Sequence, residues 1–363
     1  MQLLKKIGLI IFLVVSLFVV YTLVSTGFFR IIEPRFDGEI LKKVALKGAE
    51  DMMVSRQDRF VLISATDRAN LSEKKIKEGG LFLIDLKVDD YSLIPLTNSL
   101  NLDLEPHGIS FFKKDSTYHV LVVNHANESH TIEVFELKGN KLLHKRTLKD
   151  ESMVQPNDLV MIDEHRFYFT NDHGYTKGIG KFLEEYLGLA ISNVVYFDGE
   201  NYREVAKGIA YANGINIDRD RNLLFVASAR KFLVKVYAKQ ADGSLSFIED
   251  IPCGTGVDNI EFDEKNNLWI GCHPSLLRYN AYSKGKKEIS PSEIIKINYY
   301  KEGDYTIEKV YIEEGNEMSG STVAAIFNDL IFVGNVMDDE FLVLKRNYSV
   351  SYTHLTLPTI CSV

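Results

Sequence analysis

An internal repeat is the feature of this sequence that most limits its fold. Six segments each begin with a polar residue, run apolar, turn at a charged or asparagine-rich spot and run apolar again. They start at residues 50, 107, 157, 213, 258 and 321, a spacing of about 45–63 residues. Short apolar runs between turns predict hairpins, and segments such as 132–137 alternate as outer strands do. Four strands per repeat predict an all-β fold, a six-bladed β-propeller.

A helical solenoid is the alternative for a repeat of this length, and the Val, Ile, Phe and Tyr content argues against it. One stretch, residues 180–190, is helical in character. Its residues Phe182, Tyr186 and Leu189 share one face at i, i+4 and i+7. This short helix is either a lid over one end of the propeller or a plain packing helix.

The N-terminal segment is long and apolar. Residues 7–29 carry no charge, which is roughly 35 Å of helix at 1.5 Å per residue and enough to cross a bilayer. Lys5 and Lys6 precede it, so the N-terminus should stay cytoplasmic and the propeller lie outside. A cleaved signal peptide is the alternative, but its apolar core is usually about 7–15 residues. We expect a retained signal anchor over residues 1–29, and export with only three cysteines fits a bacterial envelope protein.

The C-terminal residues 350–363 have no clear tie to what precedes them. They are similar to a translated sequencing adapter; the alternative is an ordinary last strand containing Pro358. We therefore expect the propeller domain to span residues 30–349, with a non-native tail at 350–363. No chemistry is assigned to Thr353, His354 or Cys361.

The repeat places its polar starts in one ring. Inner strands of a propeller run side by side along the central channel, so equivalent positions meet at one end. Here they hold Glu50, His107, Asn157, Asn213, Asp258 with Asn259, and Ser321. Carboxylates and amides of this kind suit calcium, whereas no His/Cys cluster suits zinc. The alternative is that these Asn and Asp residues have no metal to bind and stand at the strand starts only because they are common in turns.

Several other functions are excluded or disfavoured. The net charge of −8 argues against a nucleic-acid partner. The chain has no G-x-S-x-G elbow, no complete P-loop and no C-x-x-C pair.

At these residues the sequence resembles the paraoxonase/arylesterase family, and more distantly the gluconolactonase-like propellers. The resemblance runs from about Arg30 to Val343. The motifs that carry it are Glu50-Asp51, Pro106-His-Gly-Ile-Ser110, Val122-Val-Asn-His125, Asn157-Asp158, Thr170-Asn-Asp-His173, Ala212-Asn-Gly-Ile-Asn216, Val257-Asp-Asn-Ile260, Leu268-Trp-Ile-Gly-Cys-His-Pro274 and Gly320-Ser-Thr-Val323.

The resemblance implies two calcium ions in the tunnel. The catalytic ion would be held by Glu50, Asn157, Asn213, Asp258 and Asn259. A deeper, structural ion would take Asp51, Asp158 and the backbone carbonyl of Ile109. The family's histidine dyad falls on His107 and His125. Further wall positions are His173, His273, Tyr211, Phe182 and Tyr186, although His173 and His273 could equally be packing histidines.

The resemblance also has departures. The mammalian members close the ring with a disulfide, but the two positions here read Glu39 and about Val343. Ring closure must then rest on strand pairing, and a displaced C-terminus would leave the last blade incomplete. Cys272 matches a free, non-catalytic family cysteine.

The implied function is calcium-dependent hydrolysis of lactones and aryl esters, with a small lipophilic substrate. Calcium would polarise the carbonyl, and His107, oriented by His125, would draw a proton from water. Asp258 is an alternative base or nucleophile. Rival functions are a phosphotriesterase or sugar lactonase on the same site, or a non-catalytic calcium-binding propeller.

Overall fold

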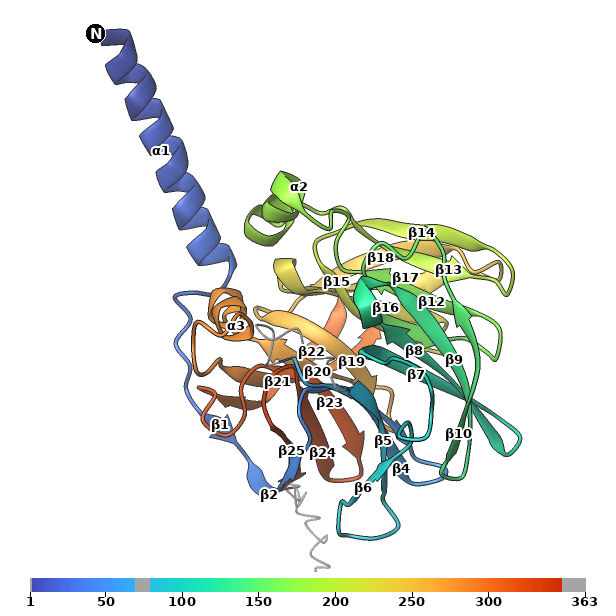
Figure 1. Ribbon diagram of the computed structural model, residues 1–363. Helices are drawn as coiled ribbons and strands as arrows, with labels where there is room; N and C mark the ends of the chain where they lie inside the picture. The colour runs from blue at the N-terminus through green and yellow to red at the C-terminus, as the bar shows by residue number, and fades with distance from the viewer. Residues whose placement is uncertain (1, 69–78, 348–363) are drawn as a thin grey trace, which may run out of the picture.

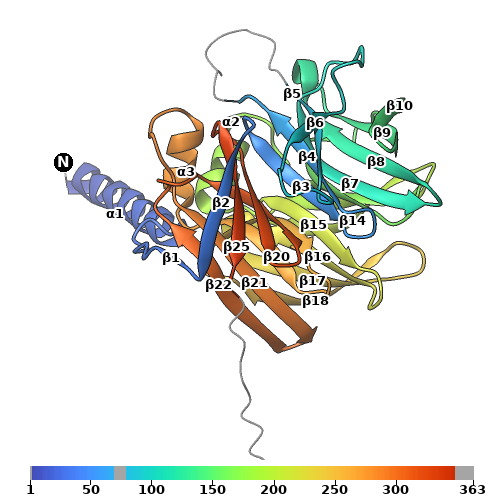
Figure 2. The same cartoon turned by 90° about the horizontal axis from the view of Figure 1, so that it is seen from below.

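Six antiparallel sheets surround a central axis in the computed structural model, which describes residues 2–68 and 79–347 (Figures 1 and 2). The predicted six-bladed β-propeller is confirmed. The first three blades, from the innermost strand outwards, are β3 (Ala49–Ser55), β4 (Phe60–Thr66), β5 (Gly79–Asp85) and β6 (Leu93–Pro95); β7 (Pro106–Lys114), β8 (Thr117–Asn124), β9 (Thr131–Lys138) and β10 (Lys141–Leu148); and β11 (Pro156–Met161), β12 (Phe167–Asn171), β13 (Ser192–Phe197) and β14 (Tyr202–Ile209).

The other three blades are built in the same way. They are β15 (Ala212–Asp218), β16 (Leu223–Ser228), β17 (Leu233–Lys239) and β18 (Leu245–Pro252); β19 (Gly256–Phe262), β20 (Leu268–His273), β21 (Ser292–Lys301) and β22 (Asp304–Glu313); and β23 (Ser321–Phe327), β24 (Leu330–Asn335) and β25 (Glu340–Arg346) with β2 (Gly38–Ala45) outermost. Each innermost strand contacts the innermost strands of both neighbouring blades, which closes the ring around the tunnel.

The N-terminal segment joins the ring at two places. β2 pairs with β25, with Glu39 opposite Lys345 and Lys42 opposite Val343, so strand pairing replaces the disulfide. The expectation of an incomplete last blade is wrong, because β2 completes it to four strands. Just before it, β1 (Arg35–Phe36) adds a fifth strand to the neighbouring blade by pairing with β22.

The hydrophobic core lies between blades rather than within one layer. Where the first and last blades meet, Met52 and Ile63 pack with Phe332 and Phe341, and all four are fully buried. Similar clusters fill the other inter-blade spaces, so each sheet is apolar on both faces. Each Å² of apolar surface buried in these clusters stabilises the fold by roughly 25 cal/mol. The clusters therefore hold the blades in fixed positions around the tunnel.

Every innermost strand carries a β-bulge at the same place near its start. The register against the second strand shifts after Ala49, Pro106, Pro156, Ala212, Val257 and Ser321. A bulge bends its strand and turns a side chain away from the regular alternation. The six bulges therefore direct the residue after each of these positions toward the tunnel end.

Helices lie at the end of the propeller that carries these bulges (Figure 1). They are α1 (Gln2–Ser25), α2 (Gly178–Phe182) with the π-helical turn η2 (Leu183–Leu187), and α3 (Leu276–Ser283), with the 3-10 turns η1 (Ala126–Glu128) and η3 (Ala229–Lys231). The predicted helix over 180–190 thus begins two residues earlier and widens into the π-helical turn η2, which is capped by Gly188 in the left-handed region, φ 66°. The predicted tail at 350–363 lies outside the described residues.

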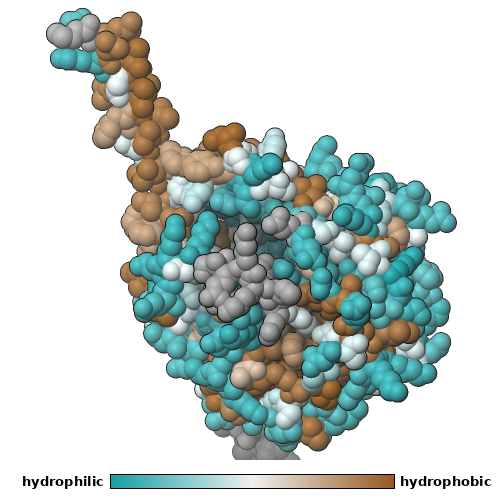
Figure 3. All heavy atoms as spheres, in the orientation of Figure 1, coloured by the Kyte–Doolittle hydropathy of each residue, from teal (hydrophilic) through white to brown (hydrophobic). Residues whose placement is uncertain are grey.

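α1 projects away from the propeller as an apolar rod (Figure 3). It is long and apolar enough to cross a membrane, with a mean hydropathy of 2.9 over 18 residues, and a signal sequence would pass the same test. Its last turns contact the lid formed by α2 and η2. The Tyr21 hydroxyl donates to the Leu187 carbonyl at 3.0 Å, and Phe18 stacks on Phe182 with ring centroids 6.0 Å apart.

Candidate metal centre and active site

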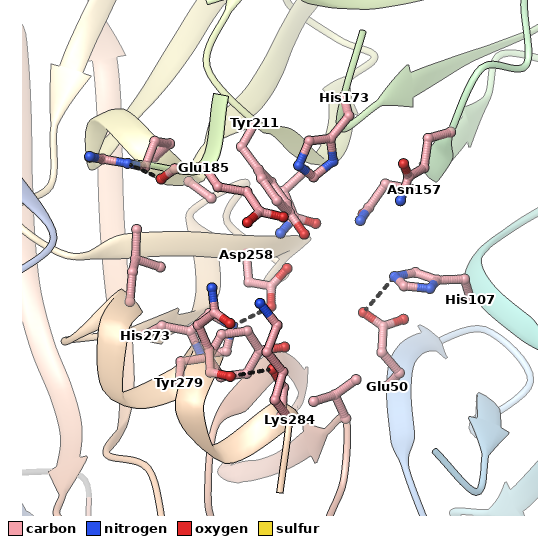
Figure 4. A pocket seen from close by; sticks show the side chains of 18 of the residues that line it. Glu50, His107, Asn157, His173, Glu185, Tyr211, Asp258, His273, Tyr279 and Lys284 are labelled. Carbon is pink, nitrogen blue, oxygen red and sulfur yellow. Dashed lines mark hydrogen bonds and ion pairs between the residues drawn. The ribbon is translucent and has the colours of Figure 1, made fainter. Parts of the chain in front are cut away.

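The bulged residues and the capping helices enclose a cavity of about 250 Å³ (Figure 4). Its floor is formed by Glu50, His107, Asn157, Asn213 and Asp258 from five different innermost strands. In the sixth strand the bulged residue is Thr322, whose hydroxyl donates to the Glu50 carbonyl at 2.6 Å. Placing Ser321 in the ring was wrong by one residue, because Ser321 lies before the bulge and its hydroxyl donates to the Glu293 carbonyl on β21 of the neighbouring blade.

Oxygen atoms without a donor gather in this floor. Among the described residues, Glu50 Oε2, Asn157 Oδ1, Asn213 Oδ1 and Asn259 Oδ1 are buried and have no hydrogen-bond partner. Asn259 lies beside Glu50, and its Nδ2 donates to Glu50 Oε1 at 2.9 Å. A buried acceptor that is left unpaired costs about 1–3 kcal/mol. Three of these residues line the same cavity and the fourth bonds to Glu50, so this set of oxygens fits a hard cation bound at the cavity floor.

The two floor carboxylates are electrostatically unfavourable as they stand. Burial raises the pKa of Glu50, although Arg68 and the Asn259 amide act against this rise. Burial also raises the pKa of Asp258 to about 6, and the hydrogen bond from His273 only partly offsets it. A raised pKa means that the site disfavours negative charge, so a bound cation would stabilise both carboxylates in their ionised form.

The pKa of Asp258 predicts how the ion-free protein responds to pH. A carboxylate whose pKa is raised by folding contributes full stability below its unfolded value near 4, and this is lost as the pH rises through the folded value of about 6. The isosteric Asp258→Asn variant cannot ionise at this position and so does not lose stability in this way. With chelator present, urea unfolding measures the free energy of unfolding of both proteins. Between about pH 4 and pH 7, we expect the value for the variant to rise by a few kcal/mol relative to that of wild type. An unchanged difference across this range would contradict the assignment.

A second, smaller cavity lies further along the tunnel. Asp51, Asp158, Ile109 and Glu261 line it. Asp51 Oδ2 accepts the Ile109 amide at 2.8 Å, and Asp158 Oδ2 accepts the Ile215 amide at 2.8 Å, so each carboxylate also ties two neighbouring blades together. Burial first, and then neighbouring carboxylates, raise the pKa of Asp51 and Asp158 well above its usual range.

Neither cavity is a conventional three-residue metal cluster. Within residues 2–68 and 79–347, no group of three or more His, Cys, Asp or Glu side chains is arranged to hold a metal ion. The candidate sets instead combine carboxylates with amide and backbone oxygens, as calcium sites commonly do. The donors present therefore fit calcium better than zinc.

His107 and His125 lie side by side at one wall. Their rings are edge to face, with centroids 5.3 Å apart, and only His107 lines the cavity. His107 Nε2 is 3.4 Å from Glu50 Oε1. Burial and the charge of Arg68 lower the pKa of His107 to about 3. Burial and the Arg68 charge therefore keep His107 neutral beside the candidate metal site. A neutral imidazole has a lone pair that can accept a proton.

Two further histidines line the cavity, and each is paired with a carboxylate. His273 Nε2 lies 2.8 Å from Asp258 Oδ2, and its ring stacks on Tyr279 at 3.6 Å. His173 Nδ1 lies 2.6 Å from Asp172 Oδ1. In both rings the other nitrogen is buried without a hydrogen-bond partner among the described residues. Both histidines line the cavity, each with one unpaired ring nitrogen, and their role in an active site stays a prediction.

The aromatic wall differs in part from the prediction. Tyr211 lines the cavity from the left-handed region, with φ 60°, and its ring contacts His173. Phe182 and Tyr186 do not line it; they stack on each other at 4.8 Å, and Phe182 also contacts α1. The lid contributes Lys181 and Glu185 instead, while Phe182 and the Leu187 carbonyl face α1.

Sequence reasoning missed several site residues. Tyr279 comes from α3, a helix too short to be detected by periodicity. Arg68 donates to the Pro106 carbonyl at 2.9 Å, and its charge acts on Glu50. Asp172 belongs to the motif that ends in His173, but the sequence did not indicate a role of its own for this residue. Glu261 sits two residues after Asn259, where strand alternation alone gives no signal for a buried carboxylate.

Comparison with known proteins gives a consistent set of similarities. The family model described as Arylesterase matches residues 70–342. Serum paraoxonase/arylesterase 2 of Rattus norvegicus is 35% identical over 267 residues, covering 72% of this chain and 75% of the relative. Serum paraoxonase/arylesterase 1 of Homo sapiens is 34% identical over 266 residues, covering 71% and 74%.

Solved structures share the fold at low identity. A gluconolactonase from Xanthomonas campestris superposes with a TM-score of 0.52 at 12% identity, covering 87% of this chain and 98% of the other. Regucalcin from Agrobacterium tumefaciens, described as a calcium-binding protein, gives a TM-score of 0.51 at 12% identity, covering 86% and 96%. At this identity the two likenesses show the propeller architecture alone.

Proposed function

Because this chain belongs to the paraoxonase/arylesterase family, we propose that it is a calcium-dependent hydrolase of lactones and aryl esters. The observation that carries the proposal is the set of four unpartnered buried oxygens, from Glu50, Asn157, Asn213 and the adjoining Asn259, at the cavity floor that also holds the buried carboxylate of Asp258. A binding propeller has no need of neutral histidines beside such a centre, whereas a hydrolase needs a base there. Membership of the family makes an esterase or lactonase the expected class of enzyme.

The residues that we assign to the cation are those that the family resemblance implies, and the buried unpaired oxygens support the assignment. Glu50, Asn157, Asn213, Asp258 and Asn259 would hold a catalytic ion at the cavity floor. Asp51, Asp158 and the Ile109 carbonyl would hold a structural ion, and Glu261 lies in the same small cavity. When bound, a calcium ion at the floor would polarise the substrate carbonyl and stabilise the oxyanion.

The side chains of this chain supply the remaining chemistry. Neutral His107 is placed to remove a proton from a water at the cavity floor, and the adjacent ring of His125 fixes its orientation. His273 Nε2 lies 2.8 Å from Asp258 Oδ2 and so fixes the orientation of this carboxylate at the cavity floor. Tyr211, Tyr279 and Leu276 provide an apolar wall for a small lipophilic acyl group.

The test is a panel of lactones and aryl esters assayed on the full-length chain with and without a calcium chelator. We expect calcium-dependent hydrolysis, with lactones favoured. Preference for a phosphotriester or for a sugar lactone would assign the same site to a rival substrate class. Calcium binding with no hydrolysis of any of these would identify a binding propeller.

We further propose that α1 is a retained membrane anchor with the propeller outside the cytoplasm. Its apolar side chains are exposed along nearly the whole helix, which costs free energy in water and none in a bilayer. Arg230 ties the base of the helix to the lid by donating to the carbonyls of Ser25 at 3.1 Å and Tyr186 at 2.6 Å. The cavity would then open close to the membrane surface, where lipophilic substrates concentrate.

Removing the anchor should release an active enzyme. A chain beginning at Arg30 keeps the bidentate ion pair with Glu293, at 2.7 and 2.5 Å, and keeps both β1 and β2. We expect it to be soluble and active, measured by fractionation and by the ester assay. A matched chain beginning at Leu46 lacks the outer strand of the last blade and should fail to fold. Loss of activity in the Arg30 chain with folding retained would show that α1 supports the site.

A further inference from the structure

A third histidine adjoins the His107–His125 pair on the side away from the cavity. His125 follows β8 and His130 precedes β9, and the turn between them is tightened by Asn127 in the left-handed region, φ 59°. This turn brings His130 Nδ1 to 2.8 Å from His125 Nδ1, with the rings edge to face at a centroid distance of 5.0 Å.

The three rings form a row from the cavity to the surface. His107 lines the cavity, His125 lies behind it at a centroid distance of 5.3 Å, and His130 lies next in line. His130 is only half-buried, so the row ends at solvent. Neither the metal ligands nor the substrate wall requires His130, yet its hydrogen bond to His125 and the ring contact of His125 with His107 place it behind the candidate base.

We propose that His130 is the outlet through which the proton released by hydrolysis leaves the tunnel. The inference rests on the proposed function and deepens it. At neutral pH one lactone and one water give one hydroxy-carboxylate and one proton. The C–O bond of the ring ester breaks, a C–O bond to the water oxygen forms, and one water proton must reach bulk solvent in each turnover.

The contact between two Nδ1 atoms fixes the protonation of the pair. A hydrogen bond at 2.8 Å needs one Nδ1 with a proton and one with a free lone pair, so the two neutral rings must be opposite tautomers. When His125 is the donor, its Nε2 is free to accept a proton arriving from the side of His107. Its Nδ1 proton then passes to His130, and the Nε2 proton of His130 passes to solvent.

The surrounding charges explain why an outlet is needed. Burial, aided by Arg68, lowers the pKa of His107, and burial with the two neighbouring histidines lowers the pKa of His125 well below its usual range. Burial also lowers the pKa of His130; Asp172 acts to raise it and Lys149 to lower it. His130 is the half-buried end of this row and bonds to His125 at 2.8 Å, so it is the ring placed to release a proton to solvent.

The first test is kinetic and uses the full-length chain. His130→Gln keeps a hydrogen-bonding side chain but cannot relay a proton, and His165→Gln changes a histidine that is 70% exposed on the turn between β11 and β12. In weak buffer we expect His130→Gln to lower kcat for lactones roughly 10-fold with little change in KM. Added imidazole should restore the rate, and His165→Gln should behave as wild type.

The second test does not depend on activity. Proton–nitrogen NMR of the histidine rings in wild type should show one strongly deshielded Nδ1 proton shared between two opposite tautomers, absent in His130→Gln. An active wild type whose kcat in weak buffer is untouched by His130→Gln would overturn the outlet. No hydrolysis by wild type on any substrate would overturn the proposed function instead, and identical tautomers in the two rings would overturn the relay in either case.

Discussion

Chelation of calcium abolishes hydrolysis and lowers the melting temperature: this is the largest effect that we expect. Four buried oxygens would lose their only counterpart, and Glu50 and Asp258 would face each other across a buried cavity. An ion that binds the folded state alone stabilises it by about 2.7 kcal/mol at one hundred times its dissociation constant. For a chain of this size we expect a fall in Tm of roughly 5 °C or more.

The measurement pairs enzyme assays with thermal unfolding in calcium and in excess chelator. Restoring calcium should recover both properties, and magnesium should not, because it demands a tighter octahedral site. Metal analysis of the purified protein should find calcium, with two ions per chain if Asp51 and Asp158 bind the second. Full activity in chelator with no ion bound would reject the metal centre.

The second large effect comes from the ligand side chains. Asp258→Ala and Asn213→Ala should each lower kcat/KM at least about 100-fold on every substrate. The oxyanion must be stabilised by the bound cation whatever the leaving group is, and both side chains would hold that cation. His107→Gln should cost about 10²–10⁴-fold on lactones and an uneven amount on other substrates. The base serves only reactions in which water must be deprotonated, so the pattern across substrates separates its role from that of the ligands.

Matched control variants lie on outer strands. Asp250→Ala removes a carboxylate of β18 that pairs with Lys235 on the surface, and Asn298→Ala removes an amide of β21. Both should leave kcat/KM within a factor of about two, since exposed pairs contribute less than about 1 kcal/mol. Equal and mild losses from Asp258→Ala, Asn213→Ala and His107→Gln would favour a binding propeller.

The sequence repeat predicted the residues of the cavity floor because the position in the repeat determines the position in space there. Each innermost strand bulges at the same repeat position, so residues that align in sequence also meet in space. The slip from Thr322 to Ser321 shows the limit of this reasoning. Bulges are set by hydrogen bonding between strands, and a polar residue on either side of one gives the same pattern in sequence.

The walls of the cavity do not follow the repeat. Tyr279 comes from the short helix α3, Lys181 from α2, and Arg68 from the segment just after β4, and none of these three side chains lies at a repeat position. The contact of Phe182 with Phe18 of α1 is made between segments far apart in the chain, which helical spacing within residues 180–190 cannot reveal. His130 gave no signal either, since only the turn at Asn127 brings it to His125.

The pairing of β2 with β25 has a consequence for the folding of the protein and for the export that we propose. Glu39 lies opposite Lys345, so a strand made near the start of the chain pairs with the last strand that the structure describes. Bringing such distant partners together carries a loop-closure cost and is slow. On the proposed membrane topology, a ring that closes only with β25 would stay open while the chain passes through a translocation channel, and β2 would wait beside the membrane near α1. The joint that completes the propeller would then delay its folding until the chain has crossed.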